Sequence, residues 1–349
     1  MEPTAVTGTI IIGAGQAGLS VARYLKEKGG TYIILDQEKQ IGASWINRYD
    51  SLIIDSFAKY SHLEGFPFPG DQKRQPHKNE VAEYLKSFAD TFGITPVFDT
   101  LVLSIQKEGD LFITITNNGI YESSAVVLAT GPFNTPSIPF YASNLPKDIH
   151  QLHAKQYKNE RELLPGTVLV VGGGNSGSEI AKELIETGRQ IFFSYKGKLK
   201  SVPSSQLSQW MAYRLGLAHI PQKSLLGKLV RWYTKGKAVG MDVGMLLNNE
   251  NVISVGRITG ITPEGKILSE KGNVGEVSVV IWATGYKSDF SIIDIPDFDP
   301  DLHTRGVTNI KGLYVLNIRW QYSKSSSHLA GISRDAKYIA NKICTINPE

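Results

Sequence analysis

Two glycine-rich segments have the residue types and the spacing to bind the phosphates of a dinucleotide. They are Gly13-Ala14-Gly15-Gln16-Ala17-Gly18 and Gly172-Gly173-Gly174-Asn175-Ser176-Gly177, and both follow the pattern G-x-G-x-x-G. The first glycine permits a tight turn, the second lets the backbone approach a pyrophosphate, and the third lets a helix pack closely on its strand. The phosphates lie at the helix N-terminus, whose unpaired N–H groups favour negative charge. The alternative for each segment is a glycine-rich turn that holds no ligand.

The residues around both segments predict the strands and the helix that such a loop needs. An apolar run at 9–12 precedes the first loop, a helical pattern follows it, and Tyr32–Leu35 predicts the next strand. The same order recurs with Val168–Val171, the second loop, a helical pattern and an apolar run at 191–193. Each copy is a βαβ unit, so the sequence predicts an α/β fold with two Rossmann-like dinucleotide-binding domains.

The residue that ends each second strand indicates which nucleotide binds where. Asp36 can accept hydrogen bonds from the ribose diol of an unphosphorylated adenosine, such as that of FAD. The second unit has Ser194-Tyr195-Lys196 at the equivalent place and no acidic residue nearby, which favours the 2′-phosphate of NADPH over NADH. A solvated surface lysine is the other interpretation of Lys196. The sequence thus predicts FAD at the first loop and NADPH at the second, with NADH as the alternative.

The composition excludes several classes of protein. Cys344 is the only cysteine, which removes intramolecular disulfides, cysteine redox pairs and cysteine-rich zinc sites. No metal-ligand set is evident, so no metal is predicted. If the protein is an oxidoreductase, its electrons must travel through a bound organic cofactor. No apolar stretch approaches the ~20 residues that span a bilayer, and no signal peptide is evident, so a cytoplasmic protein is expected. The net charge of +4 is not accompanied by any nucleic-acid-binding module.

Further motifs along the chain resemble those of one family. They are Gly42-Ala43-Ser44-Trp45, Gly65-Phe66-Pro67-Phe68-Pro69, Ala129-Thr130-Gly131-Pro132, Ala283-Thr284-Gly285-Tyr286 and Gly331-Ile332-Ser333-Arg334-Asp335-Ala336. Together with the two loops, they resemble the bacterial flavin-containing monooxygenase-like oxidoreductases. These are class B flavoprotein monooxygenases, related to plant flavin monooxygenases and to Baeyer-Villiger monooxygenases. The resemblance covers nearly the whole chain.

The resemblance implies a discontinuous FAD domain with an NADP domain inserted into it. Residues 1–136 and 284–349 are expected to form the FAD-binding domain, and residues 137–283 the NADPH-binding domain. The active site is expected in the cleft between them. Outside the glycine loops, spacing and resemblance together assign cofactor contacts to Asp36, Gln37, Gly42, Trp45, Val102, Thr130, Gly131, Lys196, Thr284, Gly285, Tyr286, Gly331 and Ile332.

Asp55 and Ser56 are the candidate catalytic residues. Alignment on the Phe66-Pro67 motif puts Asp55 where many flavin-containing monooxygenases have an asparagine that supports a flavin hydroperoxide. A carboxylate there could destabilise that species, act as an acid if burial raises its pKa, or be a solvated loop residue. Only His153 and Tyr157 match the family fingerprint FxGxxxHxxxY, and His153 is expected to be a structural residue at the domain seam.

A basic and aromatic insertion is predicted at about 197–250. No acidic residue lies between Glu186 and Asp242, while lysine and arginine alternate with leucine, tryptophan and tyrosine, so short amphipathic helices are expected. Three interpretations remain: a basic lid over NADPH that lines the substrate entrance, a patch for an anionic membrane or an acidic substrate, and a solvated basic surface.

Three functions are compatible with these observations. The resemblance favours a monooxygenase in which NADPH passes a hydride to FAD N5, a flavin hydroperoxide forms with oxygen, and a small sulfur- or nitrogen-containing substrate is oxygenated. The second is a reductase that passes electrons to a protein or quinone without oxygenation, and the third is a nucleotide-binding regulatory protein without turnover. The expected partners are oxygen and a small molecule, with a membrane surface and a homodimer as open alternatives and no nucleic acid.

Overall fold

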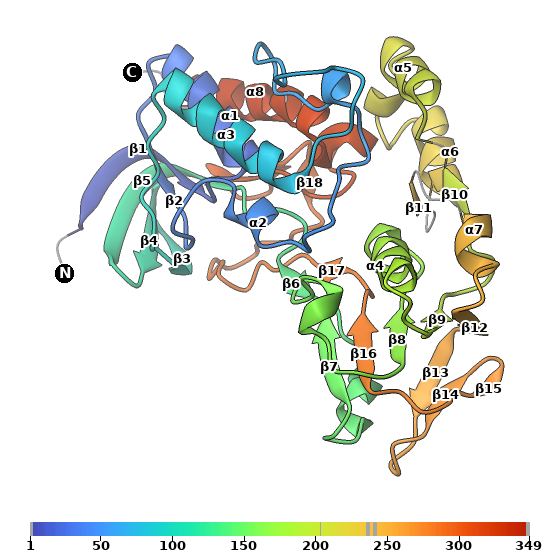
Figure 1. The fold of residues 1–349 in the computed structure, drawn as a ribbon. Coiled ribbons are helices and arrows are strands. Elements are labelled where there is room, and N and C mark those ends of the chain that lie inside the picture. The colour runs from blue at the N-terminus through green and yellow to red at the C-terminus, as the bar shows by residue number, and fades with distance from the viewer. Residues whose placement is uncertain (1–2, 203, 235–237, 240–242, 347–349) are drawn as a thin grey trace.

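Two β-sheets, one mixed and one parallel, form the frame of the protein (Figure 1). The computed structural model describes residues 3–202, 204–234, 238–239 and 243–346. The predicted α/β class with two Rossmann-like units is confirmed, because each glycine loop joins a buried parallel strand to a helix. The two sheets lie side by side, and the helices α5 (Gln206–Arg214) and α6 (Leu225–Thr234) stand apart at one end of the molecule.

The first sheet carries the first glycine loop. Its strands run in the order β18-β19-β20-β5-β1-β2, and β4, with β3 beyond it, pairs with β5 on the same edge as β20. Strands β2, β1, β5 and β20 pair in parallel, whereas β18-β19-β20 and β3-β4-β5 are antiparallel meanders. The bounds are β1 Ala5–Ile12, β2 Tyr32–Leu35, β3 Val102–Glu108, β4 Leu111–Thr116, β5 Gly119–Leu128, β18 His303–Thr304, β19 Val307–Thr308 and β20 Leu313–Val315.

Helices cover only one face of the first sheet. Helices α1 (Gln16–Glu27), α3 (Lys78–Phe92) and α8 (Leu329–Ile346) pack together on that face around one apolar cluster. The β3-β4 hairpin and an apolar segment near Phe290 cover the opposite face. The long strand β5 joins the covering hairpin to the rest of the sheet, because its first half pairs with β4 and its second half pairs with β20.

The second sheet carries the second glycine loop and is parallel throughout, with strands in the order β12-β9-β8-β16-β7. Helices α4 and α7 pack on one face, and the small sheet β13-β14-β15 with η2 covers the other. The bounds are β7 His150–His153, β8 Val168–Val171, α4 Asn175–Glu186, β9 Ile191–Ser194, α7 Val243–Leu247, β12 Val252–Gly256, β13 Ile258–Ile261, β14 Ile267–Ser269, β15 Gly272–Asn273, β16 Val279–Trp282 and η2 Phe140–Asn144.

The chain crosses between the sheets twice, and the two crossings pair with each other. Strand β6 (Thr135–Pro136) and strand β17 (Tyr286–Lys287) form a short antiparallel ribbon. Both Ala-Thr-Gly turns lie where predicted, at the ends of β5 and β16. The domain boundaries predicted at 137 and 283 lie next to this ribbon and stay a prediction.

The described part of the insertion is helical, as predicted. Besides α5 and α6, it contains β10 (Ser201–Val202), η4 (Leu217–His219) and β11 (Ala238–Val239). Pro203 and residues 235–237 and 240–242 of the predicted insertion, including Lys235 and Lys237, lie outside the described residues. Among the helices that are described, none is long and apolar enough to cross a membrane.

Candidate dinucleotide sites and active site

The first glycine loop leaves the N-terminus of α1 open to a phosphate. Gly13 has a φ of +107°, and a Cβ there would lie 2.7 Å from the Ala129 carbonyl oxygen. A Cβ on Gly18 would lie 1.9 Å from the Gly13 oxygen. Gly15 differs, because a Cβ there would meet no described atom within 4 Å. The outer glycines therefore let strand, loop and helix pack closely, whereas Gly15, the N-cap of α1, faces space that a pyrophosphate can fill.

Buried polar atoms beside this loop fit a bound FAD. Gln16 donates from Nε2 to the Ser327 carbonyl oxygen at 3.2 Å. Within the described part of the chain, Gln16 Oε1 and Asn317 Oδ1 are buried without a hydrogen-bond partner. An unsatisfied buried acceptor costs roughly 1–3 kcal/mol. The ribityl hydroxyls and ring N–H of FAD are donors of the kind that these oxygens lack.

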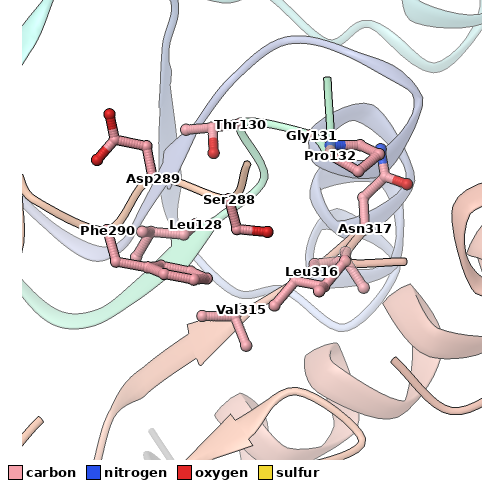
Figure 2. Close-up of a pocket in the computed structure, with 11 residues that line it drawn as sticks. Leu128, Thr130, Gly131, Pro132, Ser288, Asp289, Phe290, Val315, Leu316 and Asn317 are labelled. Carbon is pink, nitrogen blue, oxygen red and sulfur yellow. The ribbon is translucent and has the colours of Figure 1, made fainter. Parts of the chain in front are cut away.

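A hollow lies at the carboxyl ends of β5 and β20 (Figure 2). Its lining includes Thr130, Gly131 and Asn317. The carboxyl ends of parallel strands are where ligands bind in open α/β sheets. At the end of the neighbouring strand β2, Asp36 accepts hydrogen bonds from the backbone N–H groups of Ala14 at 2.6 Å and Glu38 at 2.8 Å. Asp36 thus fixes the glycine loop at the edge of the sheet that holds the hollow.

The second glycine loop repeats the geometry of the first. Gly172 has a φ of +127°, and a Cβ there would lie 2.2 Å from the Ala283 oxygen. A Cβ on Gly177 would lie 1.8 Å from the Gly172 oxygen, whereas one on Gly174 would meet no described atom within 4 Å. Gly174 is the N-cap of α4, as Gly15 is of α1. The second loop is therefore also built to receive a pyrophosphate.

Arg48 brings a positive charge to the second loop. Its Nη1 donates to the Tyr286 hydroxyl at 3.1 Å, and its Nη2 donates to Ser176 Oγ at 3.5 Å. In the described structure, Arg48 Nε is buried without a partner. A guanidinium with an unused N–H beside a helix N-terminus can bind the pyrophosphate of a nicotinamide dinucleotide.

Replacing Gly174 with alanine is expected to raise the KM for NADPH at least ~10-fold while the fold is retained. Gly174 has a φ of −83°, which alanine adopts, and the methyl group would stand where the phosphate approaches. Steady-state oxidation of NADPH and thermal unfolding measure the two effects. Gly260→Ala is the matched control, because Gly260 also has no described neighbour within 4 Å of a Cβ but lies on β13, away from the loop. Equal KM values for both variants would contradict the assignment.

Asp55 lies against the second glycine loop. Asn175 Nδ2 donates to Asp55 Oδ2 at 2.5 Å, so the first residue of α4 holds the carboxylate. Burial raises the pKa of Asp55 to about 6, and Asn175 and Lys324 oppose this rise. The Asp55 side chain is only partly exposed and is hydrogen bonded to Asn175, so it is not a freely solvated loop residue, and its catalytic role stays a prediction. Ser56 makes a hydrogen bond of 2.6 Å with Ser61, so its hydroxyl is engaged within its own loop.

A second carboxylate, that of Glu179, lies on α4 near Asp55. Burial raises the pKa of Glu179 to about 7, and the charge of Asp55 contributes to this rise. The Tyr49 hydroxyl donates to Glu179 Oε2, and burial together with this carboxylate raises the pKa of Tyr49. Two carboxylates of raised pKa can hold and exchange protons near neutral pH.

Lys324 connects this region to the first glycine loop. It begins η5 (Lys324–Ser327), whose last residue accepts the hydrogen bond from Gln16. Burial lowers the pKa of Lys324, and the attraction of Asp55 opposes this effect. Asp55 therefore lies between the loop predicted for NADPH and the segment that contacts the loop predicted for FAD.

The insertion is hydrogen bonded to the backbone of the Asp55 loop. Ser204 Oγ and Gln209 Nε2 both donate to the Asp55 carbonyl oxygen, at 2.6 and 2.7 Å. Tyr213 stacks on Tyr60 with ring centroids 4.8 Å apart. The insertion thus extends from the second sheet to a loop of the first, which is the placement expected of a lid over the site.

Comparison with known proteins agrees with this geometry. The sequence profile of the pyridine nucleotide-disulphide oxidoreductase family matches residues 10–225, from strand β1 to the first residue of α6. The chain belongs to this family. Because the only cysteine is Cys344, this family member has no cysteine pair of its own for disulfide chemistry.

Its relatives identify it as a flavin-containing monooxygenase-like oxidoreductase. Uncharacterized oxidoreductase CzcO of Bacillus velezensis is 38% identical and covers 96% of this chain and 98% of its own. The probable indole-3-pyruvate monooxygenase YUCCA3 of Arabidopsis thaliana is 30% identical over 97% of this chain and 86% of its own. A flavin-containing monooxygenase from Stenotrophomonas maltophilia shares the fold, with a TM-score of 0.79, 22% identity and coverage of 98% and 99%. FAD and NADP(H) as cofactors are confirmed at the level of the family.

The remaining predicted residues of this oxidoreductase lie in different surroundings. Trp45 on α2 (Ala43–Ile46) packs against the cores of both sheets, and Gly42 lets α2 approach α3, since a Cβ would lie 2.7 Å from Ala82. Val102 is buried at the start of β3, and Ile332 is buried in the first core. Gln37 and Lys196 are exposed after β2 and β9. The positions of Gln37 and Lys196 do not by themselves bring either side chain to a cofactor, and both contacts stay predictions.

Three more predicted residues lie where the chain crosses from the second sheet back to the first. Thr284 Oγ1 donates to the Ser137 carbonyl oxygen at 2.5 Å, and the Gly285 oxygen lies 2.9 Å from His153 Nε2. The His153 ring packs against Tyr286 at 4.9 Å, so this histidine lies at the seam as predicted. Gly331 is close to η5, because a Cβ there would lie 2.1 Å from the Ser325 oxygen.

Sequence reasoning assigned no role to Arg48, Glu179, Lys324 and Asn317. Arg48 belongs to the run Arg48-Tyr49-Asp50, which begins three residues after Trp45 of the Gly42 to Trp45 motif, and this position was a signal that could have been used. Glu179 lies four residues after Asn175, hence on the same helix face. Lys324 begins the short helix η5 and Asn317 lies in the loop after β20. Neither belongs to a recognisable sequence pattern, and only the fold brings them to the site.

Proposed function

We propose that this oxidoreductase is an NADPH-dependent, FAD-containing monooxygenase that oxygenates a small sulfur- or nitrogen-containing molecule. When bound, FAD accepts a hydride from the nicotinamide and, once reduced, passes electrons to oxygen. The observation that carries the proposal is the position of Asp55 between Asn175 of the second glycine loop and Lys324 beside the first. A protein that only bound nucleotides would have no need for a partly buried ionisable group at this junction.

The chain's own residues would supply binding, orientation and proton control. The helix N-termini at Gly15 and Gly174 would hold the two pyrophosphates, and Arg48 would add a charge-assisted contact at the second. Asp55 would orient Asn175 and hold a proton on its carboxyl group at slightly acid pH. The insertion, through Ser204 and Gln209, would keep this loop in place and limit the entry of water.

The test is rapid mixing of the NADPH-reduced protein with oxygen in the absence of any candidate substrate. We expect an absorbance transient that lasts for seconds before oxidised flavin returns. Its decay should accelerate when sulfides or amines are added, and an oxygenated product should form. Immediate return to oxidised flavin with release of hydrogen peroxide would contradict the proposal.

A reductase is the second candidate, and one observation favours it. Asp55 stands where many of the monooxygenases that the chain resembles carry an asparagine, and an ionised carboxylate is no hydrogen-bond donor. A reductase would transfer electrons from NADPH to a quinone or a one-electron acceptor at a rate independent of oxygen. The same rapid-mixing experiment, repeated with a soluble quinone, separates the two functions.

Replacing Lys196 with alanine is expected to raise the KM for NADPH ~10-fold and to leave the KM for NADH unchanged. Lys196 is exposed just after β9, where the adenosine ribose of a nicotinamide dinucleotide is expected, and its ammonium would pair with the 2′-phosphate. Steady-state kinetics with both nucleotides measures the effect, and NADH serves as the internal control. An equal change for both nucleotides would show that Lys196 does not read the 2′-phosphate.

A further inference from the structure

Helix α6 turns its apolar face away from the protein. Leu225, Leu226, Leu229, Trp232 and Tyr233 are 85%, 62%, 57%, 75% and 49% exposed. At 100° per residue these side chains share one face of the helix. The opposite face contains Gly227, which is buried against the Pro221 carbonyl oxygen. A helix that served only as part of a core would have the reverse orientation.

Helix α5 repeats this arrangement. Its inner face carries Gln209 and Tyr213, which contact the Asp55 loop and Tyr60. Its outer face carries Leu207, Trp210 and Met211, which are 64%, 47% and 40% exposed and are spaced i, i+3, i+4. Both helices stand at the same outer end of the molecule (Figure 1). A cluster of large apolar side chains on a protein surface marks an interaction site.

The charged residues on and beside the outer faces of α5 and α6 indicate what kind of partner these faces would bind. Arg214 on α5, Lys223 before α6, and Lys228 on α6 are exposed, and no acidic residue lies between Glu186 and Asp242. A symmetric contact with a second copy would place this basic surface against itself. Anionic lipid headgroups would instead neutralise the lysines and arginines, while leucine and tryptophan enter the acyl boundary.

We propose that α5 and α6 dock the protein on the surface of an anionic lipid bilayer. The apolar side chains would insert to the depth of the headgroups, and the basic side chains would contact lipid phosphates. Neither helix would cross the membrane. The inner contacts of α5 with the Asp55 loop would then place the mouth of the site beside the lipid surface.

The experiment measures binding of the FAD-loaded protein to vesicles by sedimentation. Vesicles of phosphatidylcholine alone are compared with vesicles that contain phosphatidylglycerol, at low and at high salt. We expect binding only to the anionic vesicles, weakened by salt, with a blue shift of tryptophan fluorescence. The triple variant Leu225→Ser, Leu229→Ser and Trp232→Ser should bind at least ~10-fold more weakly, and so should Lys223→Gln with Lys228→Gln.

Phe140→Ser is the matched control. Phe140 is 91% exposed on η2, which packs on the second sheet, and its loss should leave binding unchanged. Flavin absorbance shows that each variant is folded, and the readout does not depend on the proposed activity. The proposal is overturned if the wild-type protein ignores anionic vesicles or if the triple variant binds them equally well. It is also overturned if the protein forms a dimer that the triple variant abolishes.

Discussion

Replacing Gly18 with alanine is expected to yield a protein that purifies without FAD and is less stable than the wild type. The new Cβ would lie 1.9 Å from the Gly13 carbonyl oxygen and 3.2 Å from Ile11 Cγ2. Both the backbone of the glycine loop and the core would have to move, at a cost of about 3 kcal/mol. The ratio of flavin to protein absorbance and the thermal unfolding of the flavin-free protein measure the two effects.

Gly15→Ala separates cofactor binding from folding. Gly15 has a φ of −80° and no described neighbour within 4 Å of a Cβ, so alanine fits the protein itself. We expect the flavin-free variant to unfold within ~0.5 kcal/mol of the flavin-free wild type and yet to bind FAD at least ~10-fold more weakly. If Gly15→Ala binds FAD as well as the wild type does, the first loop does not hold the pyrophosphate.

Replacing Asp55 with asparagine is expected to stabilise the protein at neutral pH and not in acid. The pKa of Asp55 is raised from 3.8 to about 6 in the folded state, so the folded protein binds this proton more tightly than the unfolded chain. The contribution of Asp55 to stability is therefore most favourable below about pH 4 and is lost as the pH rises through 6. An asparagine side chain does not ionise, and its carbonyl oxygen accepts the bond from Asn175 equally well. Above pH 6 the variant should gain on the order of 1–3 kcal/mol, measured by urea unfolding at pH 4 and pH 8.

The same substitution should change the reaction with oxygen. If the charge on Asp55 controls the lifetime of the absorbance transient, that lifetime should vary between pH 5 and 7 in the wild type. In Asp55→Asn it should be long and show no step near pH 6. Glu179, whose pKa is raised to about 7, faces the same site, so Glu179→Gln is the control that assigns the step. A step near pH 6 that persists in Asp55→Asn would remove Asp55 from this role.

The frame of the protein could be predicted from the sequence because its signals are local. Each glycine loop, with an apolar run before it and a helical pattern after it, specifies one βαβ unit, and the structure contains both. Differences occur at the ends of elements. Strand β1 begins at Ala5 rather than near residue 9, because its first half is only partly buried and its residues therefore form no continuous apolar run. Helix α8 begins at Leu329, two residues before Gly331.

The site could be predicted only in part, because its polar contacts join distant segments. Asn175 and Asp55 are 120 positions apart in the sequence, and Arg48 and Tyr286 are 238 apart. Neither pair leaves a local pattern. The sequence proposed Asp55 as a candidate through resemblance, but its burial, its partner and the neighbouring Lys324 follow from the packing of two sheets. The outward orientation of α6 could not be predicted from the sequence either, since an apolar stripe has the same spacing whether it faces a core or solvent.

The ribbon of β6 and β17 determines how the two halves can move. Two short strands that are hydrogen bonded to each other can twist and bend, but they cannot lengthen as a single flexible linker would. We therefore expect any separation of the two sheets to proceed by rotation about this ribbon. The hydrogen bond of Asn175 with Asp55 involves neither strand of the ribbon, so such a rotation would break it. Each opening would then expose the charge on Asp55 to water, and each closure would bury it again.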